Sequence, residues 1–433
     1  MSLPRYPQYR DSGVAWLGDV PVHWHVRRLG FYFDERREKV SDKDYPALSV
    51  TKTGIVPQLD TAAKTDDGDN RKKVCPGDFV INSRSDRKGS AGASQLEGSV
   101  SLINTVLRPM NDINIEFAHY LLRSAPFQEE FYRYGKGIVA DLWSTNYSEM
   151  RNIVLALPSQ EEQAAIANVL DHETRKIDAL VAEQERLLAL LAEKRQAILS
   201  RAVTRGLNSD APMKESGVAW LGEVPAHWGV GALGYLCSIE TGATPDRGEP
   251  RYWNGSIPWL KTGEINWAPI SEAEEFISED GLVNSATKLA KPGTLLMAMY
   301  GQGVTRGRVA LLEIEAAYNQ ACAAMLFGPR ILPSFARYFF MAAYDYVRDS
   351  GNETSQMNLS AGLIAKFKLT IPPVDEQADI VRMLDSEIAR FDSLNTEARR
   401  AIALLKERRS ALIAAAVTGK IDVRNAVPRK MAA

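Results

Sequence analysis

The feature that most constrains this chain is an internal repeat. Residues 11–30 read DSGVAWLGDVPVHWHVRRLG and residues 215–234 read ESGVAWLGEVPAHWGVGALG, an offset of 204 residues. A second pair of blocks, LPSQEEQAAIANVLDHETRKIDAL from Leu157 and IPPVDEQADIVRMLDSEIARFDSL from Ile371, is offset by 214 residues. The shared blocks match closely, while the stretches between them barely match. The chain is therefore two tandem copies of one unit, in which a common frame carries two different variable modules.

Composition places the chain among ordinary globular proteins. A length of 433 residues, with 45% hydrophobic and 24% charged residues, is typical of a protein of several domains. No stretch is apolar enough to span a membrane, and the start of the chain lacks a signal-peptide core, so we expect a cytoplasmic protein. The three cysteines, Cys75, Cys237 and Cys322, lie far apart, which favours buried thiols over a disulfide framework or a zinc site.

Two long helices are expected in the frame. After Pro158 and after Pro373, acidic residues open a stretch without Gly or Pro that continues to Gly206 and Gly419 respectively. We therefore predict helices over 160–204 and 374–418, each about 65 Å long at 1.5 Å per residue.

Apolar residues recur along both predicted helices at heptad spacing. This spacing indicates a coiled coil, and two such helices separated by a whole module can pair antiparallel. We predict that the copies are related by an approximate two-fold axis, and that polar residues in the seam fix its register. The alternative, that each helix packs only on its own module, is less consistent with so narrow an apolar stripe. The predicted seam residues are Leu170, Ile177, Leu180, Leu191, Leu384, Phe391, Leu394 and Leu405.

Each variable module mixes short apolar runs with turn residues and has helical stretches near its end, which predicts an α+β module. Polar and cationic residues gather on loops at equivalent places in the two modules, after the repeated Lys-Thr-Gly and Pro-Gly landmarks. Such side chains can read base edges and neutralise phosphates, whereas a solvated charged loop is the alternative for any one of them. The net charge of −2 requires any basic surface to be local. The candidate DNA-binding residues are Lys52, Thr53, Asn82, Arg84, Arg87, Lys88, Lys261, Thr262, Tyr300, Gln302, Arg306 and Arg308.

Catalytic motifs are incomplete in this sequence. Residues 85–88 match S-x-x-K and Lys-Thr-Gly occurs twice, but the S-D-N element of penicillin-binding enzymes is missing. Neither a Walker A motif nor the N-P-P-Y type of motif expected of a DNA amino-methyltransferase is present. The histidines are too sparse for a metal site. The sequence therefore predicts no catalytic residues, no metal site and no cofactor of its own.

With these blocks laid out, the chain resembles the DNA-specificity subunits of type I restriction–modification enzymes. The resemblance rests on the repeated leaders, on the helix openings LPSQEEQAAIANVLD and IPPVDEQADIVRMLD, and on the two-copy layout. PRYWNGSIPWLKTGEI and YNQACAAMLF in the second copy also resemble a recurring type of target-recognition module. Module one has no counterpart of YWNG, so its target should differ.

The resemblance implies four segments: target-recognition domains over 1–158 and 207–372, and helices over 159–206 and 373–424, with a tail to 433. Each domain would read one half of a bipartite site in double-stranded DNA. The helices would set the spacing and dock two methyltransferase subunits, which bind S-adenosylmethionine, and motor–nuclease subunits would complete the complex. Two other classes stay open at this point: a coiled-coil scaffold whose modules bind proteins, and an unrecognised enzyme.

Overall fold

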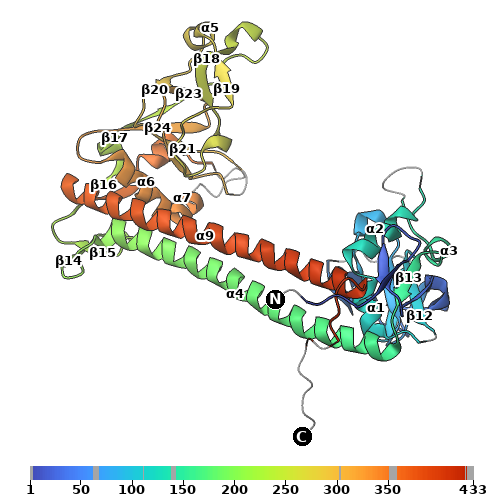
Figure 1. Ribbon diagram of the computed structural model, residues 1–433. Helices are drawn as coiled ribbons and strands as arrows, with labels where there is room; N and C mark the ends of the chain where they lie inside the picture. The colour runs from blue at the N-terminus through green and yellow to red at the C-terminus, as the bar shows by residue number, and fades with distance from the viewer. Residues whose placement is uncertain are drawn as a thin grey trace. The chain divides into compact units, whose positions relative to one another are not determined.

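The computed structural model describes residues 3–61, 68–110, 112–137, 143–301, 304–350, 358–424 and 426. Contacts divide the chain into two compact units (Figure 1). Unit 1 comprises Met1–Glu185 and Arg399–Ala433, and unit 2 comprises Arg186–Ala398. Each unit therefore contains one module and one half of each long helix. The division into four segments that we inferred from the sequence places its boundaries at the helix ends instead, and it stays a prediction.

Both predicted long helices are present. Helix α4 spans Gln160–Arg205 and helix α9 spans Val374–Val417, with 46 and 44 residues. Acidic side chains occupy the first turn of each helix, where they complement the helix dipole. Gly206 and Gly419 follow the last turns with φ of +73° and +72°, a left-handed conformation that glycine adopts without steric cost. None of the described helices has the length and apolar character needed to cross a bilayer.

Within unit 1, the start of α4 pairs with the end of α9. Asp178 forms an ion pair with Arg409 at 2.8 Å, and Glu185 forms one with Lys406 at 3.5 Å. Residue numbers rise along α4 while they fall along α9, so the two segments run antiparallel. Leu170 is fully buried in this unit, in a core that also holds Val417.

Within unit 2, the end of α4 pairs in the same way with the start of α9. Arg195 forms an ion pair with Asp392 at 2.7 Å. Eleven residues further along the chain, just after α4, a Cβ placed on Gly206 would lie 3.2 Å from a carboxylate oxygen of Glu376, near the start of α9. The antiparallel pairing predicted from the heptads is therefore present in each unit.

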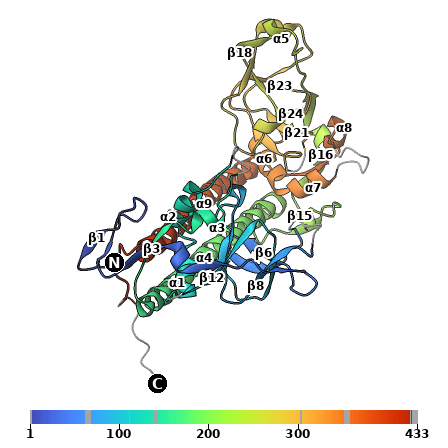
Figure 2. The same cartoon turned by 90° about the vertical axis from the view of Figure 1, so that its right-hand side faces the viewer.

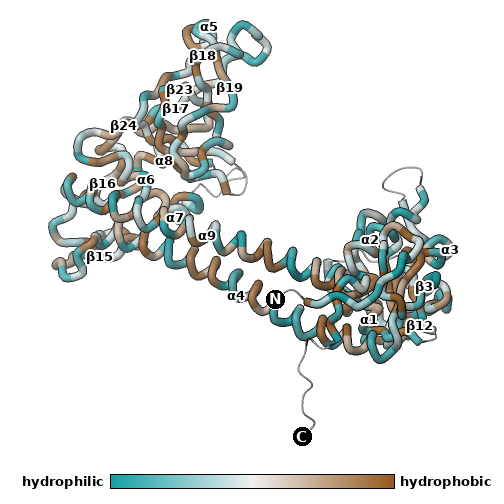
Figure 3. Tube along the Cα trace, in the orientation of Figure 1, coloured by the Kyte–Doolittle hydropathy of each residue, from teal (hydrophilic) through white to brown (hydrophobic). Residues whose placement is uncertain are grey.

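The buried residues between the two helices differ in part from the predicted seam. Leu170, Ile177, Leu191, Leu384 and Phe391 are buried as expected, and Leu405 is half-buried. The prediction was wrong for Leu180 and Leu394, which are 53% and 38% exposed. The inward row alternates steps of four and three, so that the position after Ile177 is Val181 rather than Leu180, and the one after Phe391 is Asn395. Figure 3 shows hydrophobic and hydrophilic residues alternating along both helices.

The module in unit 1 is built on a four-stranded antiparallel sheet in the order β10-β9-β12-β4. A three-stranded sheet, β11-β8-β5, and the hairpin β6-β7 lie on the same module, and helices α1, α2 and α3 complete it (Figure 2). The bounds are β3 (His25–Arg28), β4 (Phe33–Glu35), β5 (Lys39–Val40), β6 (Leu48–Thr51), β7 (Gly54–Pro57), β8 (Arg71–Val74), β9 (Phe79–Asn82), β10 (Ala91–Ala93), β11 (Gly98–Val100), β12 (Asn104–Pro109), β13 (Val154–Leu157), α1 (Ile115–Leu121), α2 (Ala125–Arg133) and α3 (Tyr147–Met150).

The module in unit 2 repeats the first sheet as β22-β21-β24-β17 but has a different second sheet, β19-β18-β23-β20. Helices α6 and α7 lie on the α9 side, and α5, β18 and β19 lie at the end of the unit away from α9 (Figures 1 and 2). The bounds are β16 (Gly229–Ala232), β17 (Cys237–Thr241), β18 (Trp253–Leu260), β19 (Glu275–Ile277), β20 (Leu289–Ala290), β21 (Leu295–Ala298), β22 (Val309–Leu311), β23 (Ala316–Tyr318), β24 (Cys322–Phe327), β25 (Lys368–Ile371), α5 (Glu279–Val283), α6 (Pro333–Ala342), α7 (Tyr344–Asp349) and α8 (Ala361–Ile364).

A two-stranded ribbon and a hairpin recur in both copies and connect the leader to the rest of the frame. The ribbon is β3-β13 in unit 1 and β16-β25 in unit 2, and its second strand leads directly into a long helix. The hairpin is formed by β1 (Tyr9–Asp11) with β2 (Asp19–Pro21), and by β14 (Met213–Glu215) with β15 (Glu223–Pro225). The repeated sequence blocks thus form repeated structure, and the modules differ mainly in their second sheets.

The repeated His-Trp pair has a structural role at the helix start. In unit 1 the carboxylate of Glu162 lies 2.9 Å from Nε2 of His23 and accepts hydrogen bonds from Nε1 of Trp24 and the hydroxyl of Tyr6 at 3.2 and 2.8 Å. Unit 2 repeats the arrangement at Glu376, which lies 2.9 Å from His227 and accepts from Trp228 at 3.0 Å. These contacts join each leader to the first turn of the following helix.

Candidate nucleic-acid interface

Predicted site residues from separate segments of the chain line one cavity in unit 1. The cavity has a volume of about 670 Å³, and Lys52, Asn82 and Arg87 all line it. Lys52 lies in the turn between β6 and β7, Asn82 ends β9, and Arg87 lies in the short 3₁₀ helix Ser85–Arg87 after β9. The hairpin turn and the strand end therefore bring an amide and two cations to one concave surface.

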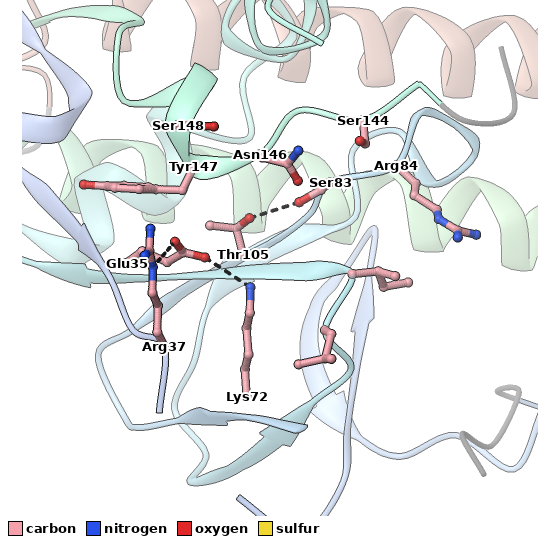
Figure 4. A pocket seen from close by; sticks show the side chains of 12 residues that line it. Glu35, Arg37, Lys72, Ser83, Arg84, Thr105, Ser144, Asn146, Tyr147 and Ser148 are labelled. Carbon is pink, nitrogen blue, oxygen red and sulfur yellow. Dashed lines mark hydrogen bonds and ion pairs between the residues drawn. The ribbon is translucent and has the colours of Figure 1, made fainter. Parts of the chain in front are cut away.

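A second cavity of about 370 Å³ shares Ile103 with the first. Arg84 lines its rim and points away from the cluster of Glu35, Arg37 and Lys72 on its other side (Figure 4). Within this cluster Glu35 contacts the guanidinium of Arg37 at 2.8 Å and the ammonium of Lys72 at 3.1 Å. Lys72 is thus neutralised inside the module, whereas Arg84 is exposed and forms no ion pair among the described residues.

Local contacts hold these loops in place. Arg123 donates a hydrogen bond to the backbone carbonyl of Lys52, and the hydroxyls of Thr53 and Thr51 lie 2.8 Å apart across the same turn. The Asn82 side chain accepts from the backbone N–H of Arg84 at 3.1 Å. The ammonium of Lys88 lies 5.1 Å from the centre of the Tyr132 ring. The exposed cations thus stand on turns whose backbones are fixed.

The charge of this surface is set by which cations are already paired. Arg71 also lines the larger cavity, but it is buried, donates to Ser99 Oγ at 2.8 Å, and burial lowers its pKa. Arg87 lies 3.6 Å from Asp86, and both side chains are largely exposed. An exposed pair of this kind is weak and is screened by salt. Lys52, Arg84 and Arg87 therefore remain able to meet an anionic partner.

The corresponding residues of unit 2 have a different environment. Lys261 contacts Glu275 at 2.8 Å and Glu274 at 3.2 Å, and the hydrogen bond that its ammonium donates to Glu275 raises the lysine pKa. Arg306 is buried, and its guanidinium donates to the carbonyl of Arg348 at 2.6 Å. Lys261 is therefore already paired with carboxylates near the surface, and Arg306 is held inside the module.

The other predicted residues of unit 2 are spread over two segments. Thr262 begins the 3₁₀ helix Thr262–Glu264 that follows β18. Tyr300 is 40% exposed and Arg308 is half-buried, and both belong to the connection between β21 and β22. Gln302 lies outside the described residues.

One cluster in unit 2 was not predicted from the sequence patterns. The guanidinium of Arg247 lies 3.7 Å from the centre of the Trp253 ring and 5.0 Å from that of Trp259. Glu275 forms an ion pair with the same guanidinium at 2.7 Å. A guanidinium that is stacked and paired in this way is held in one orientation. The only signal in the sequence was an arginine placed shortly before PRYWNG in a Gly- and Pro-rich stretch.

Among the described residues, no group of three His, Cys, Asp or Glu side chains could hold a metal ion. The polar cavities of unit 1 instead present amides, hydroxyls and guanidinium groups. These are the groups that bind phosphates and base edges in protein–DNA complexes.

Comparison with known proteins shows one consistent similarity. The family model of the type I restriction modification DNA specificity domain matches residues 225–403. The EcoR124I/EcoR124II specificity subunit of Escherichia coli is 23% identical over 399 residues, covering 87% of this chain and 88% of that protein. The EcoKI specificity subunit of Escherichia coli K12 is also 23% identical, covering 81% of this chain and 76% of that protein.

Solved structures agree in fold. A chain from a structure concerned with complex assembly and conformational transition of the type I R-M system superimposes with a TM-score of 0.72 at 17% identity, covering 92% of this chain and 98% of that chain. The HsdS subunit of Thermoanaerobacter tengcongensis gives a TM-score of 0.55 at 17% identity with the same coverage. The predicted fold class, α+β modules with two long helices, is confirmed.

Residues 225–403 therefore match the DNA specificity domain of the type I restriction–modification class. Over most of its length the chain is similar to type I restriction–modification specificity subunits, as its repeated leaders and helix openings indicated.

Proposed function

We propose that this protein is a non-catalytic subunit that reads a bipartite DNA sequence, one half with each module. The observation that carries the proposal is the cavity of unit 1, where Lys52, Asn82 and Arg87 meet from two different loops. Asparagine pairs bidentately with adenine, and arginine with guanine, in the major groove. Lysine and arginine also neutralise phosphates, which supplies affinity without sequence information.

The module assignment is tested by single substitutions in unit 1. We expect Arg87→Ala or Asn82→Ala to impair recognition of one half-site only, and a lost bidentate base contact costs about 1–3 kcal/mol. A lost phosphate contact, expected for Lys52→Ala, should instead weaken all sequences alike and reduce the salt slope by about one. Arg108→Ala is the matched control, because Arg108 is an exposed arginine of the same unit that lines neither cavity.

The assay measures DNA methylation by the assembled complex on the mapped target and on single-base variants of each half-site. Equal losses on both half-sites would contradict the modular reading. Failure of the assembled complex to retain any DNA at moderate salt would favour the alternative of a scaffold whose modules bind proteins.

We propose further that the paired helices set the distance between half-sites and dock two methyltransferase subunits. These subunits would bind S-adenosylmethionine, and motor–nuclease subunits would complete the restriction complex. Support comes from leucines that the seam leaves uncovered: Leu180 and Leu404 in unit 1, and Leu187, Leu190 and Leu394 in unit 2 are all at least 38% exposed. Exposed apolar side chains in a row are typical of protein-binding surfaces.

The spacing role is tested by inserting one heptad after Arg186, which keeps the seam in phase. Seven helical residues add about 10 Å, or about three base pairs of B-DNA. We expect the preferred spacer between half-sites to shift while both half-sites stay the same, measured by methylation of a library with variable spacers. A folded, active variant with an unchanged spacer preference would rule out this role.

A further inference from the structure

An open groove in unit 1 is the strongest feature that DNA reading does not explain. The groove has a volume of about 650 Å³ and lies between α2 and the last turns of α9. Trp16 lines it together with small side chains, among them Ala125, Ala411 and Ala414. Among the described residues, the one aromatic neighbour of Trp16 is Phe127, edge-on at 6.2 Å between ring centres. The indole thus borders an opening that small side chains leave unfilled.

The repeat supplies an internal comparison for this groove. The equivalent tryptophan in unit 2 is Trp220, whose ring is stacked on Tyr346 with centres 5.4 Å apart and planes at 27°. Gln196 of α4 closes the same side by donating to the carbonyl of Ala342 at 2.9 Å. In unit 1 the repeat places Ser410 where unit 2 has Gln196, and the serine side chain is too short to make that link. The frame therefore has room for a planar group stacked on this tryptophan. In unit 2 the ring of Tyr346 is that group, whereas unit 1 has an open groove at the same place.

Charge indicates which planar group suits unit 1. Three glutamates and one arginine, Arg133, line the groove, and Glu130 is paired with Arg133 at 2.6 Å. Glu129 and Glu407 are exposed, and neither forms an ion pair within the described part of the chain. A planar cation satisfies both features, since a guanidinium stacks on an indole face and donates to carboxylates.

We propose that the groove binds an arginine side chain of a methyltransferase subunit, so that the two docking positions on this chain are chemically unequal. The inference rests on the proposed docking of two such subunits. Contacts made by the repeated frame would be shared by both subunits, whereas the arginine contact would be available only at unit 1. One methyltransferase subunit should therefore bind more tightly than the other.

The test is a titration of the full chain with its cognate methyltransferase subunit, followed by native mass spectrometry to obtain both stepwise dissociation constants. The double variant Glu129→Gln/Glu407→Gln should weaken one step by at least about tenfold and leave the other unchanged. Glu193→Gln is the matched control, because Glu193 is exposed and occupies the position in α4 that Glu407 occupies in α9. Ala411→Trp, at an exposed position, fills the groove without altering charge and should weaken the same step.

Each outcome decides the proposal. If both groove variants have the same stepwise dissociation constants as the wild-type chain, the arginine site is ruled out while the docking role stays intact. Equal weakening of the first and second binding steps would rule out the arginine site as well. If the wild-type chain binds no methyltransferase subunit, the docking role itself fails, and this inference fails with it. Circular dichroism of each variant separates loss of binding from loss of folding.

Discussion

The glycines that end the two long helices allow a quantitative test of how the frame is held together. Gly419 has a φ of +72°, and a Cβ at this position would lie 2.5 Å from Cδ and 2.8 Å from Cγ of Pro21. Left-handed backbone costs an L-residue about 1–2 kcal/mol. Overpacking against a fixed neighbour adds about 1–3 kcal/mol. We therefore expect Gly419→Ala to destabilise unit 1 by about 2–5 kcal/mol.

Gly13 is the matched control for this substitution. Its φ is +74°, but nothing lies within 4 Å of the position that a Cβ would take. Gly13→Ala should therefore cost only the backbone term of about 1–2 kcal/mol. Gly206→Ala should act on unit 2 with an intermediate cost, because its Cβ would lie 3.0 Å from the Trp228 ring.

Hydrogen exchange followed by mass spectrometry is the appropriate assay, because a chain of two units need not unfold in one step. The free energy of opening should fall in peptides of unit 1 for Gly419→Ala and in peptides of unit 2 for Gly206→Ala. If Gly419→Ala and Gly13→Ala have equal effects, the close approach of Pro21 to the helix end is not a constraint on the frame.

Three further predictions follow from the same structure. Leu191→Ala should cost about 2–5 kcal/mol in thermal unfolding, whereas Leu180→Ala, at an exposed position, should cost less than about 0.5 kcal/mol. Glu162→Ala should expose the start of α4 to hydrogen exchange, because it removes the acceptor of two buried hydrogen bonds. Burial, and then the charge of Arg123, lowers the pKa of His119 to about 4, while the unfolded value is about 6.5. The unfolded chain therefore takes up the proton first, so the free energy of unfolding should fall as pH drops from about 6.5 to 4, less steeply in His119→Gln.

The frame could be predicted from the sequence because its signals are local and occur twice. Helix α4 begins and ends within one residue of the predicted bounds, since acidic residues and a glycine mark its ends. The seam was harder, because after Ile177 both Leu180 and Val181 satisfy a heptad pattern. A step of three or of four is decided by which side of α4 faces α9, and that is a tertiary property.

The site residues were only partly predictable from the sequence. Strand pairing decides which cations lie beside a carboxylate and which stay available to bind an anionic partner. Lys261 reaches Glu274 and Glu275, which lie on the neighbouring strand β19 or just before it. The sequence shows these carboxylates thirteen and fourteen residues away, without the β18–β19 pairing that places them beside the lysine. In unit 1 the exposed Lys52 has no such neighbour among the described residues.

The two copies also show how a repeat separates structural residues from specialised ones. Where both copies keep a residue and its contacts, as with Glu162 and Glu376, the role belongs to the frame, since the frame is what both modules share. Where the residue is kept but part of its contacts differs, as with Trp16 and Trp220, the two copies have specialised around the same side chain: both rings meet a phenylalanine edge-on, and only Trp220 is also stacked on a tyrosine. Both indoles are half-buried, but Tyr346 stacks on Trp220, whereas Trp16 borders the open groove in which we propose that an arginine of a partner subunit stacks.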